Sequence, residues 1–206
     1  MEREFRAVLR PGDAPPDAPS ERSCGGCTLC CTVLRVDELG KLGGTPCAKL
    51  RADAGGCGIY QSRPSICRRY RCLWLQGAFQ EADRPDRIGA VLDLLTRAGT
   101  THLAVREAAP GALDRSERLG AIAGRYRAFM PVHVTDAHDV MNPDAPVRVL
   151  LPDGVEQRIE GEWVTTLRSG CPAERRRLSW FQRRVRQLLQ WLRAARLRWV
   201  SGRSPE

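Results

Sequence analysis

Eight cysteines between residues 24 and 72 are the side chains best suited to chemistry in this chain. They are Cys24, Cys27, Cys30, Cys31, Cys47, Cys57, Cys67 and Cys72, and the ninth cysteine, Cys171, lies far from them in the sequence. Thiolate sulfur binds zinc and iron strongly, and a CxxC spacing lets the chain wrap back so that both sulfurs face one metal. This spacing occurs twice in succession in CGGCTLCC, residues 24–31, so the sequence predicts a metal centre.

The number and type of metal centres stay open at this level. Cys31 directly follows Cys30, and neighbouring side chains of an extended chain point to opposite sides, so the pair suits two centres or a polynuclear one. Eight thiols are twice the four that a closed zinc site needs. The run formed by Cys24, Cys27 and Cys30 resembles three ligands of a bacterial ferredoxin, although the usual continuation is absent, and it favours an iron–sulfur cluster. Eight cysteines in a loop-rich segment favour zinc.

The cellular compartment decides between disulfides and metal, because cysteine clusters form disulfides in secreted proteins and metal sites in the cytosol. Residues 1–23 alternate charged with apolar residues and then become Pro-rich, unlike the continuous apolar core of a secretory signal. No apolar stretch of about 18 or more residues follows that would predict a membrane span. We therefore expect a cytoplasmic protein without a membrane span, in which the thiols stay reduced.

Longer blocks around these cysteines resemble a known family. The blocks are CGGCTLCC, CGIYQSRPSICRRYRC (57–72), WLQG (74–77) and RPDRIGAVLDL (84–94). Together they are similar to the bacterial YkgJ-type CxxCxxCC cysteine-cluster family of zinc- or iron-chelating domains, most clearly over residues 22–95. The resemblance implies metal chelation by Cys24, Cys27, Cys30, Cys31, Cys57 and Cys67, with Cys72 as a further ligand. Cys47 matches only by lying between the two blocks, and the resemblance implies little about the cellular role.

Two residues of the second block are candidates for supporting a bound metal or cluster. Tyr60 can cover the centre with an aromatic face, while the Arg63-Pro64 pair favours a turn or an extended conformation before Cys67. Arg68 can donate a hydrogen bond to a thiolate or a cluster sulfur. It can equally be a solvent-facing residue of an arginine-rich chain.

The elements that must position these thiols fall into four segments, and the predicted fold class is α+β. Residues 1–21 are expected to form a disordered or extended arm, and residues 22–80 an irregular cysteine-cluster module. This module is rich in Gly and Cys and has one short helical candidate at 32–42, so we expect it to bury little apolar surface and to be stapled by metal. Residues 81–168 predict a small α+β unit, and residues 169–206 an Arg-rich amphipathic helix and tail.

Alternation of apolar residues predicts strands at 88–95 and 101–108, joined as a β-hairpin by a turn that contains Gly99. Further strand patterns occupy 131–135, 147–151 and 155–167. Between them, residues 113–130 predict an amphipathic helix with Asp114 and Glu117 as a capping box. Helical periodicity also runs from about Pro172 to Val200, so we expect one long C-terminal helix there.

The formal charge of +9 is concentrated at the C-terminal end, where residues 173–206 hold ten arginines against Glu174 and Glu206. Arginines with Trp180, Trp191 and Trp199 nearby suit the phosphates of nucleic acid or an anionic membrane surface. The apolar stripe of the same helix favours packing or a protein partner. The leading interpretation is metal binding. The alternative is a zinc-stapled adaptor that binds nucleic acid, the ribosome or a protein partner through this helix.

Other candidate chemistry is weaker. His133, Asp136, His138 and Asp139 are metal-binding residue types, but their spacing matches no zinc motif and we interpret them as surface residues. His102 is expected on the solvent side of its strand, and Cys171 is expected to be a small packing residue at the start of the last helix. The sequence indicates no general acid, general base or phosphate loop, so the question of enzymatic activity stays open.

Overall fold

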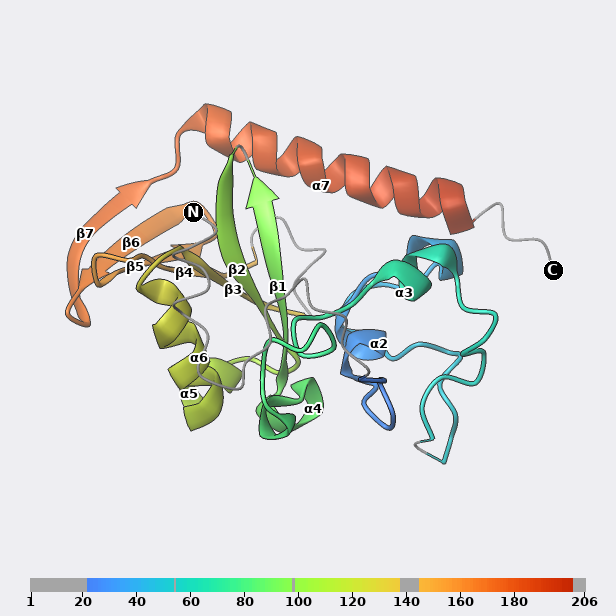
Figure 1. The fold of residues 1–206 in the computed structure, drawn as a ribbon. Coiled ribbons are helices and arrows are strands. Elements are labelled where there is room, and N and C mark those ends of the chain that lie inside the picture. The colour runs from blue at the N-terminus through green and yellow to red at the C-terminus, as the bar shows by residue number, and fades with distance from the viewer. Residues whose placement is uncertain (1–21, 54, 98, 138–144, 202–206) are drawn as a thin grey trace.

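A seven-stranded mixed sheet forms the centre of the computed structural model, with its strands side by side in sequence order (Figure 1). The structure describes residues 22–53, 55–97, 99–137 and 145–201, so the predicted arm at 1–21 lies outside the described residues. The strands are β1 (Ala90–Arg97), β2 (Thr100–Glu107), β3 (Val132–Asp136), β4 (Val147–Leu150), β5 (Val155–Glu160), β6 (Trp163–Arg168) and β7 (Cys171–Arg177). A sheet with separate helices confirms the predicted α+β class.

One neighbouring pair of these strands, β2 with β3, is parallel, and the other pairs are antiparallel. Parallel neighbours need a crossover connection, which α5 (Ala112–Arg115) and α6 (Glu117–Arg127) supply. Leu119 and Ile122 of α6 join Leu103 of β2 and Val132 of β3 in one buried core cluster. The crossover helices therefore cover one face of the sheet.

The hairpin predicted for 88–95 and 101–108 is confirmed as β1 and β2, which pair from Ala90 with Glu107 to Arg97 with Thr100. The run at 155–167, which we treated as one strand segment, is instead the two strands β5 and β6. Gly161 has a φ of 53° between them and allows the chain to reverse.

The start of α6 differs from the prediction. Ser116 is its N-cap, because the Ser116 hydroxyl accepts a hydrogen bond from the N–H of Leu119. Asp114 lies within the separate short helix α5 and accepts a hydrogen bond from Arg148 on β4. The predicted capping box of Asp114 and Glu117 is therefore wrong, since a serine two positions later offers an equally good cap.

The segment predicted as the start of the C-terminal helix is a strand. Cys171–Arg177 forms the edge strand β7, which pairs with β6. Ser169 (φ 50°) and Gly170 (φ 80°) make the tight turn between the two strands, and positive φ at both positions is typical of hairpin turns. Pairing with β6 thus overrides the local helical pattern.

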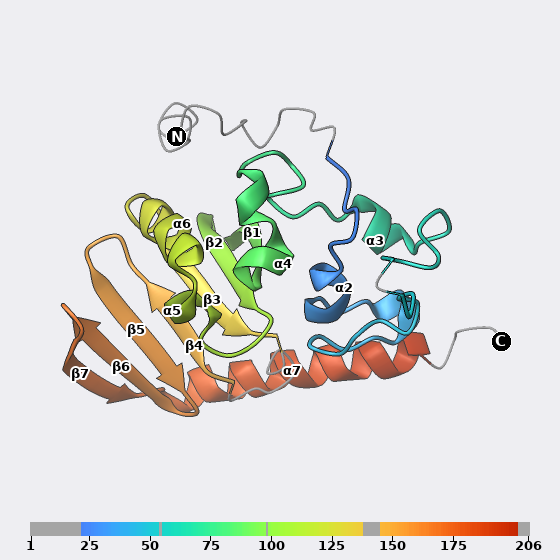
Figure 2. The ribbon, with the colours of Figure 1, turned by 90° about the horizontal axis from the view of Figure 1, so that it is seen from below.

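The helix α7 spans Trp180–Ser201 and begins with a capping box that the sequence analysis missed. The Ser179 hydroxyl accepts from the N–H of Gln182, and the Gln182 side chain accepts from the N–H of Ser179. α7 then runs along one side of the molecule, from the sheet to the cysteine-rich segment, where it contacts η1 (Asp37–Leu39) (Figure 2). Among the described residues, no helix combines the length and apolar character that a membrane span requires.

Short helices and loops make up the cysteine-rich segment and its junction with the sheet. The helices other than η1 are α2 (Leu29–Val33), α3 (Ser65–Arg69), η2 (Glu81–Asp83) and α4 (Pro85–Ile88). The continuous helix predicted for 32–42 is wrong, because the backbone is extended at Leu34 and Val36, and Val36 bridges to Lys41. Two β-branched valines and the left-handed Gly40 favour this interruption.

The two ends of the cysteine-rich segment share the core of the sheet, whereas its middle does not. Val33, Leu73 and Phe79 are buried in the cluster that contains the sheet residues. The N–H of Leu73 also donates to the carbonyl of Leu92 on the free edge of β1. Between residues 37 and 71, none of the described hydrophobic side chains is buried. The expectation of little apolar burial therefore holds for 37–71 and is wrong for 72–79.

Candidate metal centre

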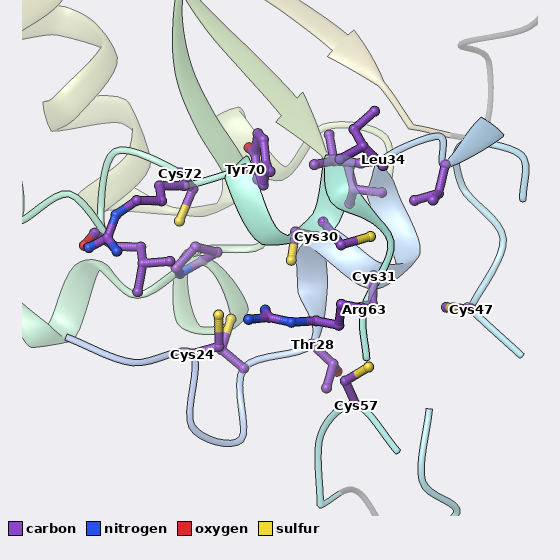
Figure 3. A pocket seen from close by; sticks show the side chains of 18 of the residues that line it. Cys24, Thr28, Cys30, Cys31, Leu34, Cys47, Cys57, Arg63, Tyr70 and Cys72 are labelled. Carbon is purple, nitrogen blue, oxygen red and sulfur yellow. The ribbon is translucent and has the colours of Figure 1, made fainter. Parts of the chain in front are cut away.

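All eight clustered cysteines line one cavity of about 810 Å³ (Figure 3). The cavity lies between the cysteine-rich segment and the sheet, where Leu94 and Leu95 of β1 form part of its wall. Cys72 is buried, and the other seven thiols are partly buried. The fold thus places around one space the same set of residues that the sequence analysis selected.

The thiols are free but are spread over the cavity wall. The nine cysteines of the chain form no disulfide. Within the described ranges, no three Cys, His, Asp or Glu side chains are gathered closely enough to hold a metal ion as they stand. The donors suit zinc or an iron–sulfur cluster by chemical type, because both prefer thiolate ligands. Binding requires side-chain rotation and contraction of the surrounding loops.

The cysteines of the first run are held by a turn and by α2. The N–H of Cys27 donates to the carbonyl of Cys24 at 2.8 Å, which closes the turn of the first CxxC pair. Cys30 and Cys31 follow on α2. Cys24 and Cys30 pack against the core cluster that includes Cys72. Cys72, far along the sequence, therefore belongs to the core against which the first run packs.

Cys47 and Cys57 belong to a loop that folds back on itself. The N–H of Cys47 donates to the carbonyl of Cys31 at 3.1 Å, which fixes Cys47 beside α2. Leu50 and Cys57 form an antiparallel bridge, so the chain returns Cys57 to the neighbourhood of Cys47.

Cys67 lies on α3, whose first turn is attached to η1 by Glu38. The Glu38 carboxylate accepts hydrogen bonds from the N–H of Ser65 (3.0 Å), the Ser65 hydroxyl (2.9 Å) and the N–H of Ile66 (3.1 Å). The hydrogen bonds from Ile66 and Ser65 lower the pKa of Glu38. Glu38 therefore helps to set the position of α3 and, with it, of Cys67.

Burial raises the pKa of several thiols, namely those of Cys24, Cys27, Cys67 and Cys72. Cys30 and Cys31 titrate as a pair. The Cys30 thiol donates to the Cys31 sulfur, which raises the pKa of Cys30 and lowers the pKa of Cys31 to about 7. The positive charges of Lys41 and Arg63 lower the pKa of Cys31 further. Cys31 is thus the member of the pair that ionises first.

Lys41 is a buried cation beside the cavity that the sequence analysis missed. Its ammonium donates to the carbonyls of Thr32 and Leu42, both at 2.9 Å, and to that of Leu34. The lysine ammonium carries three protons on one nitrogen, so it can donate to three carbonyls grouped around it. The donors of an arginine guanidinium lie in one plane on three nitrogens and do not suit this arrangement. Burial lowers the pKa of Lys41, and the neighbouring thiols, Cys47 first, counteract this effect.

The amino-acid composition could have pointed to Lys41 as an unusual residue. Lys41 and Lys49 are the only lysines of an otherwise arginine-rich chain, and both line the cavity.

Cations outnumber anions around the cavity. The positively charged lining residues are Arg35, Lys41, Lys49, Arg63, Arg69, Arg71 and Arg106, whereas Asp93 is the single acidic residue among the described residues of the wall. A positive surplus favours thiolates and offsets the negative charge of a thiolate-bound metal. Arg68, predicted as a supporting donor, is exposed and does not line the cavity, whereas its neighbour Arg69 does.

Tyr60 lines the cavity, but its ring is covered by Arg63. The guanidinium carbon of Arg63 lies 3.6 Å from the ring centroid, and its Nε donates to the Tyr60 carbonyl at 2.8 Å. In Figure 3 the Arg63 side chain extends toward Cys24, and its charge lowers the pKa of that thiol. Arg63 is therefore better placed than Arg68 to support bound metal.

A polar cluster closes the cavity on the side of the sheet. The Tyr70 hydroxyl donates to Asp93 on β1 at 2.7 Å, and Arg106 on β2 forms an ion pair with the same carboxylate. Burial raises the pKa of Tyr70, so its hydroxyl stays protonated. This cluster anchors the chain between Cys67 and Cys72 to the sheet.

Two predictions away from the cavity are wrong. His102 is only 5% exposed and stacks on His133, with 4.2 Å between the ring centroids, because both faces of β2 are covered near its middle. Cys171 is exposed at the start of β7 and is not a packing residue. Of the weak metal-site candidates, Asp136 ends β3, while His138 and Asp139 lie outside the described residues.

No model of a known protein family, no curated protein and no solved structure matches this chain. The function is therefore inferred from the residues that surround the cavity.

Proposed function

We propose that this chain is a metal-binding protein that holds zinc or an iron–sulfur cluster through its eight clustered cysteines. The observation that carries the proposal is that all eight line a single cavity and none is used in a disulfide. The positive surplus around the cavity supports it, because such charges favour metal-ligating thiolates. The resemblance of residues 22–95 to the YkgJ-type cysteine-cluster family points to the same function.

Both kinds of metal suit the donors and would serve different purposes. Zinc would be a redox-silent staple for residues 37–71, where no described hydrophobic side chain is buried. An iron–sulfur cluster would add electron transfer or redox sensing. Free thiols in this number suit a reducing compartment, so we propose a cytoplasmic location.

Elemental analysis of protein purified without oxygen tests this proposal. Iron with acid-labile sulfide and a brown colour identifies a cluster, whereas a colourless protein with stoichiometric zinc identifies the staple. A variant with both Cys27→Ser and Cys30→Ser should lose metal, and Cys171→Ser, which changes an exposed cysteine away from the cavity, should retain it. Wild-type protein that contains neither metal and takes up neither would overturn the proposal.

A second candidate function is docking to a protein partner through α7. Large apolar side chains of this helix are between 48% and 68% exposed, namely Trp180, Phe181, Leu188, Leu189, Trp191 and Leu192. Arginines of the same helix already have contacts: Arg183 pairs with Glu162, Arg186 donates to a backbone carbonyl, and Arg184 covers a tryptophan. Exposed apolar groups with engaged cations favour an apolar groove on a protein over nucleic-acid phosphates.

The salt dependence of binding separates these two kinds of partner. We expect weak retention on mixed nucleic acid at physiological salt, because the three α7 arginines whose side chains are described, Arg183, Arg184 and Arg186, each already have a contact. Tight binding that falls steeply as salt rises would instead favour the nucleic-acid or ribosome alternative. The Cys27 and Cys30 double variant should leave docking through α7 unchanged.

A further inference from the structure

We infer that the eight thiols divide into two sets of four and that the cavity holds two separate metal centres. The inner set is Cys24, Cys27, Cys30 and Cys72, and the outer set is Cys31, Cys47, Cys57 and Cys67. This inference rests on the proposed metal binding and adds the number of centres and the ligands of each. Four thiolates complete either a closed zinc site or the coordination of one iron–sulfur cluster.

The inner set is anchored to the core beside the sheet. Cys72 belongs to the buried core cluster, and Cys24 and Cys30 pack against it. The sulfur of Cys27 accepts a hydrogen bond from the backbone N–H of Asp86 in α4, the helix that leads into β1. All four sulfurs therefore depend on the part of the protein that is held by hydrophobic packing.

The outer set is carried by elements that are joined through polar contacts. Cys47 is hydrogen-bonded through its backbone to Cys31, and Cys57 returns through its bridge with Leu50. Cys67 lies on α3, and hydrogen bonds to Glu38 hold the start of this helix. Three of these cysteines lie within residues 37–71, where no described hydrophobic side chain is buried.

The two sets meet on α2 at the adjacent residues Cys30 and Cys31. Successive side chains of an α-helix are rotated by about 100°, and the hydrogen bond from the Cys30 thiol to the Cys31 sulfur marks the place where the sets adjoin. Cys30 packs against the core cluster, while the carbonyl of Cys31 accepts the hydrogen bond from the loop residue Cys47. Figure 3 shows Cys24, Cys30 and Cys72 on one side of the cavity, and Cys47 and Cys57 on the other.

Counting bound cobalt in the full-length protein tests the division. Metal-free reduced protein is titrated with Co²⁺, tetrahedral thiolate absorption is recorded, and the bound metal is counted after desalting. We expect two equivalents in the wild type and one in Cys72→Ser. Cys57→Ser should also bind one equivalent, and the double variant of Cys72 and Cys57 should bind none. Cys171→Ser, the matched control, should bind two.

A pair of changes within one set sharpens the test. The double variant of Cys24→Ser and Cys72→Ser should still bind one equivalent, because both changes fall in the inner set. Cadmium NMR offers a second measurement on the same proteins. The wild type should give two resonances, and Cys57→Ser should remove one and leave the other in place. Far-UV circular dichroism checks that the sheet of each variant is folded.

Failure of this inference is distinct from failure of metal binding. Wild-type protein that binds metal in a single centre, or a folded Cys72→Ser variant that loses all of its metal, would overturn the two-centre division and leave metal binding intact. Wild-type protein that takes up no cobalt, zinc or iron would overturn the proposed function itself. If the native metal is an iron–sulfur cluster, either single variant should halve iron and acid-labile sulfide together.

Discussion

Lys41 interacts with both the backbone and the thiols of the cysteine-rich segment. Its ammonium holds the carbonyls of Thr32, Leu34 and Leu42 together, and it lies close enough to Cys31 to lower the pKa of that thiol. Three hydrogen bonds to backbone carbonyls hold this ammonium in place beside the thiols. Lys41 therefore has both a structural and an electrostatic effect on the outer set.

Replacing Lys41 with methionine should weaken metal binding by the outer set. The change keeps the length of the side chain, removes the charge and leaves three carbonyls without their donor. We expect a loss of about 10–100-fold in affinity for one of the two metals, as for other residues that support ligands. Competition with a chelator measures the affinity. Lys49→Met, which removes the other cavity lysine, should have a smaller effect, and equal losses in both variants would contradict this role of Lys41.

The paired thiols of Cys30 and Cys31 should differ in reactivity when no metal is bound. Only the thiolate is nucleophilic, and the pKa of Cys31 is about 7 while that of Cys30 is raised. Cys31 should therefore ionise at a lower pH than Cys30, and its ionised fraction should fall as the pH is lowered.

Iodoacetamide labelling followed by peptide mass spectrometry checks this difference. Cys31 should be modified well before Cys30 at pH 7, and its rate should fall as the pH is lowered. In Cys30→Ala, which removes the side-chain donor, the pKa of Cys31 should move upward and the rate at pH 7 should decrease. Faster labelling of Cys30 than of Cys31 would contradict the assignment.

At the scale of elements, the contact between η1 and α3 positions Cys67, one cysteine of the proposed outer set. The carboxylate of Glu38 replaces the missing acceptors at the first turn of α3, and this turn lies just before Cys67. Hydrogen bonds lower the pKa of Glu38, so the contact is complete above the ordinary pKa of a glutamate and is lost as the pH falls through the lowered value.

Glu38→Ala should loosen α3 and weaken the outer metal centre by about 10-fold, with little effect on the inner one. Amide hydrogen exchange of residues 65–69 should accelerate in the same variant. Glu81→Ala removes an exposed glutamate of η2 that pairs with Arg84, outside α3, and it serves as the control. Unchanged exchange at α3 would show that Glu38 does not hold this helix.

The β1–β2 hairpin was predicted correctly because its signal is local, namely two apolar runs around Gly99. The spacing of the cysteines selected the eight thiols that line the cavity, but it does not encode how they are grouped there. Strand β7 could not be recognised, because its seven residues are all exposed and only pairing with β6 makes them extended. The wall of the cavity beyond the cysteines, Lys41 and Asp93 in particular, depends on long-range packing that spacing does not encode.

At the scale of the whole molecule, one core connects the sheet to both ends of the cysteine-rich segment. Leu73 is 1% exposed, lies one residue after the inner ligand Cys72 and donates its N–H to the edge of β1. Ile122 belongs to the same core cluster from the side of α6. The inner set of thiols should therefore unfold together with the sheet.

Leu73→Ala should lower the free energy of unfolding by about 2–5 kcal/mol, the usual range for a fully buried leucine. Urea unfolding should show one transition by tryptophan fluorescence and by far-UV circular dichroism, and Ile122→Ala should shift the same transition. Leu42→Ala, at a side chain that is 41% exposed, is the control and should have little effect. Two separate transitions would show that the cysteine-rich segment folds as an independent unit.

Among the described residues, strand β7 has no neighbour on one side, and its sequence affects how copies of the protein meet. Successive arginines, Arg175 to Arg177, stand on this exposed strand. If the β7 edges of two copies came together, these arginines would repel one another. Charged side chains on edge strands commonly prevent such edge-to-edge aggregation. Salt weakens this repulsion, because salt at about 0.1 M screens charges that are more than roughly 10 Å apart. Solubility should therefore be greatest in dilute buffer, and concentrated brine should encourage this protein to form aggregates.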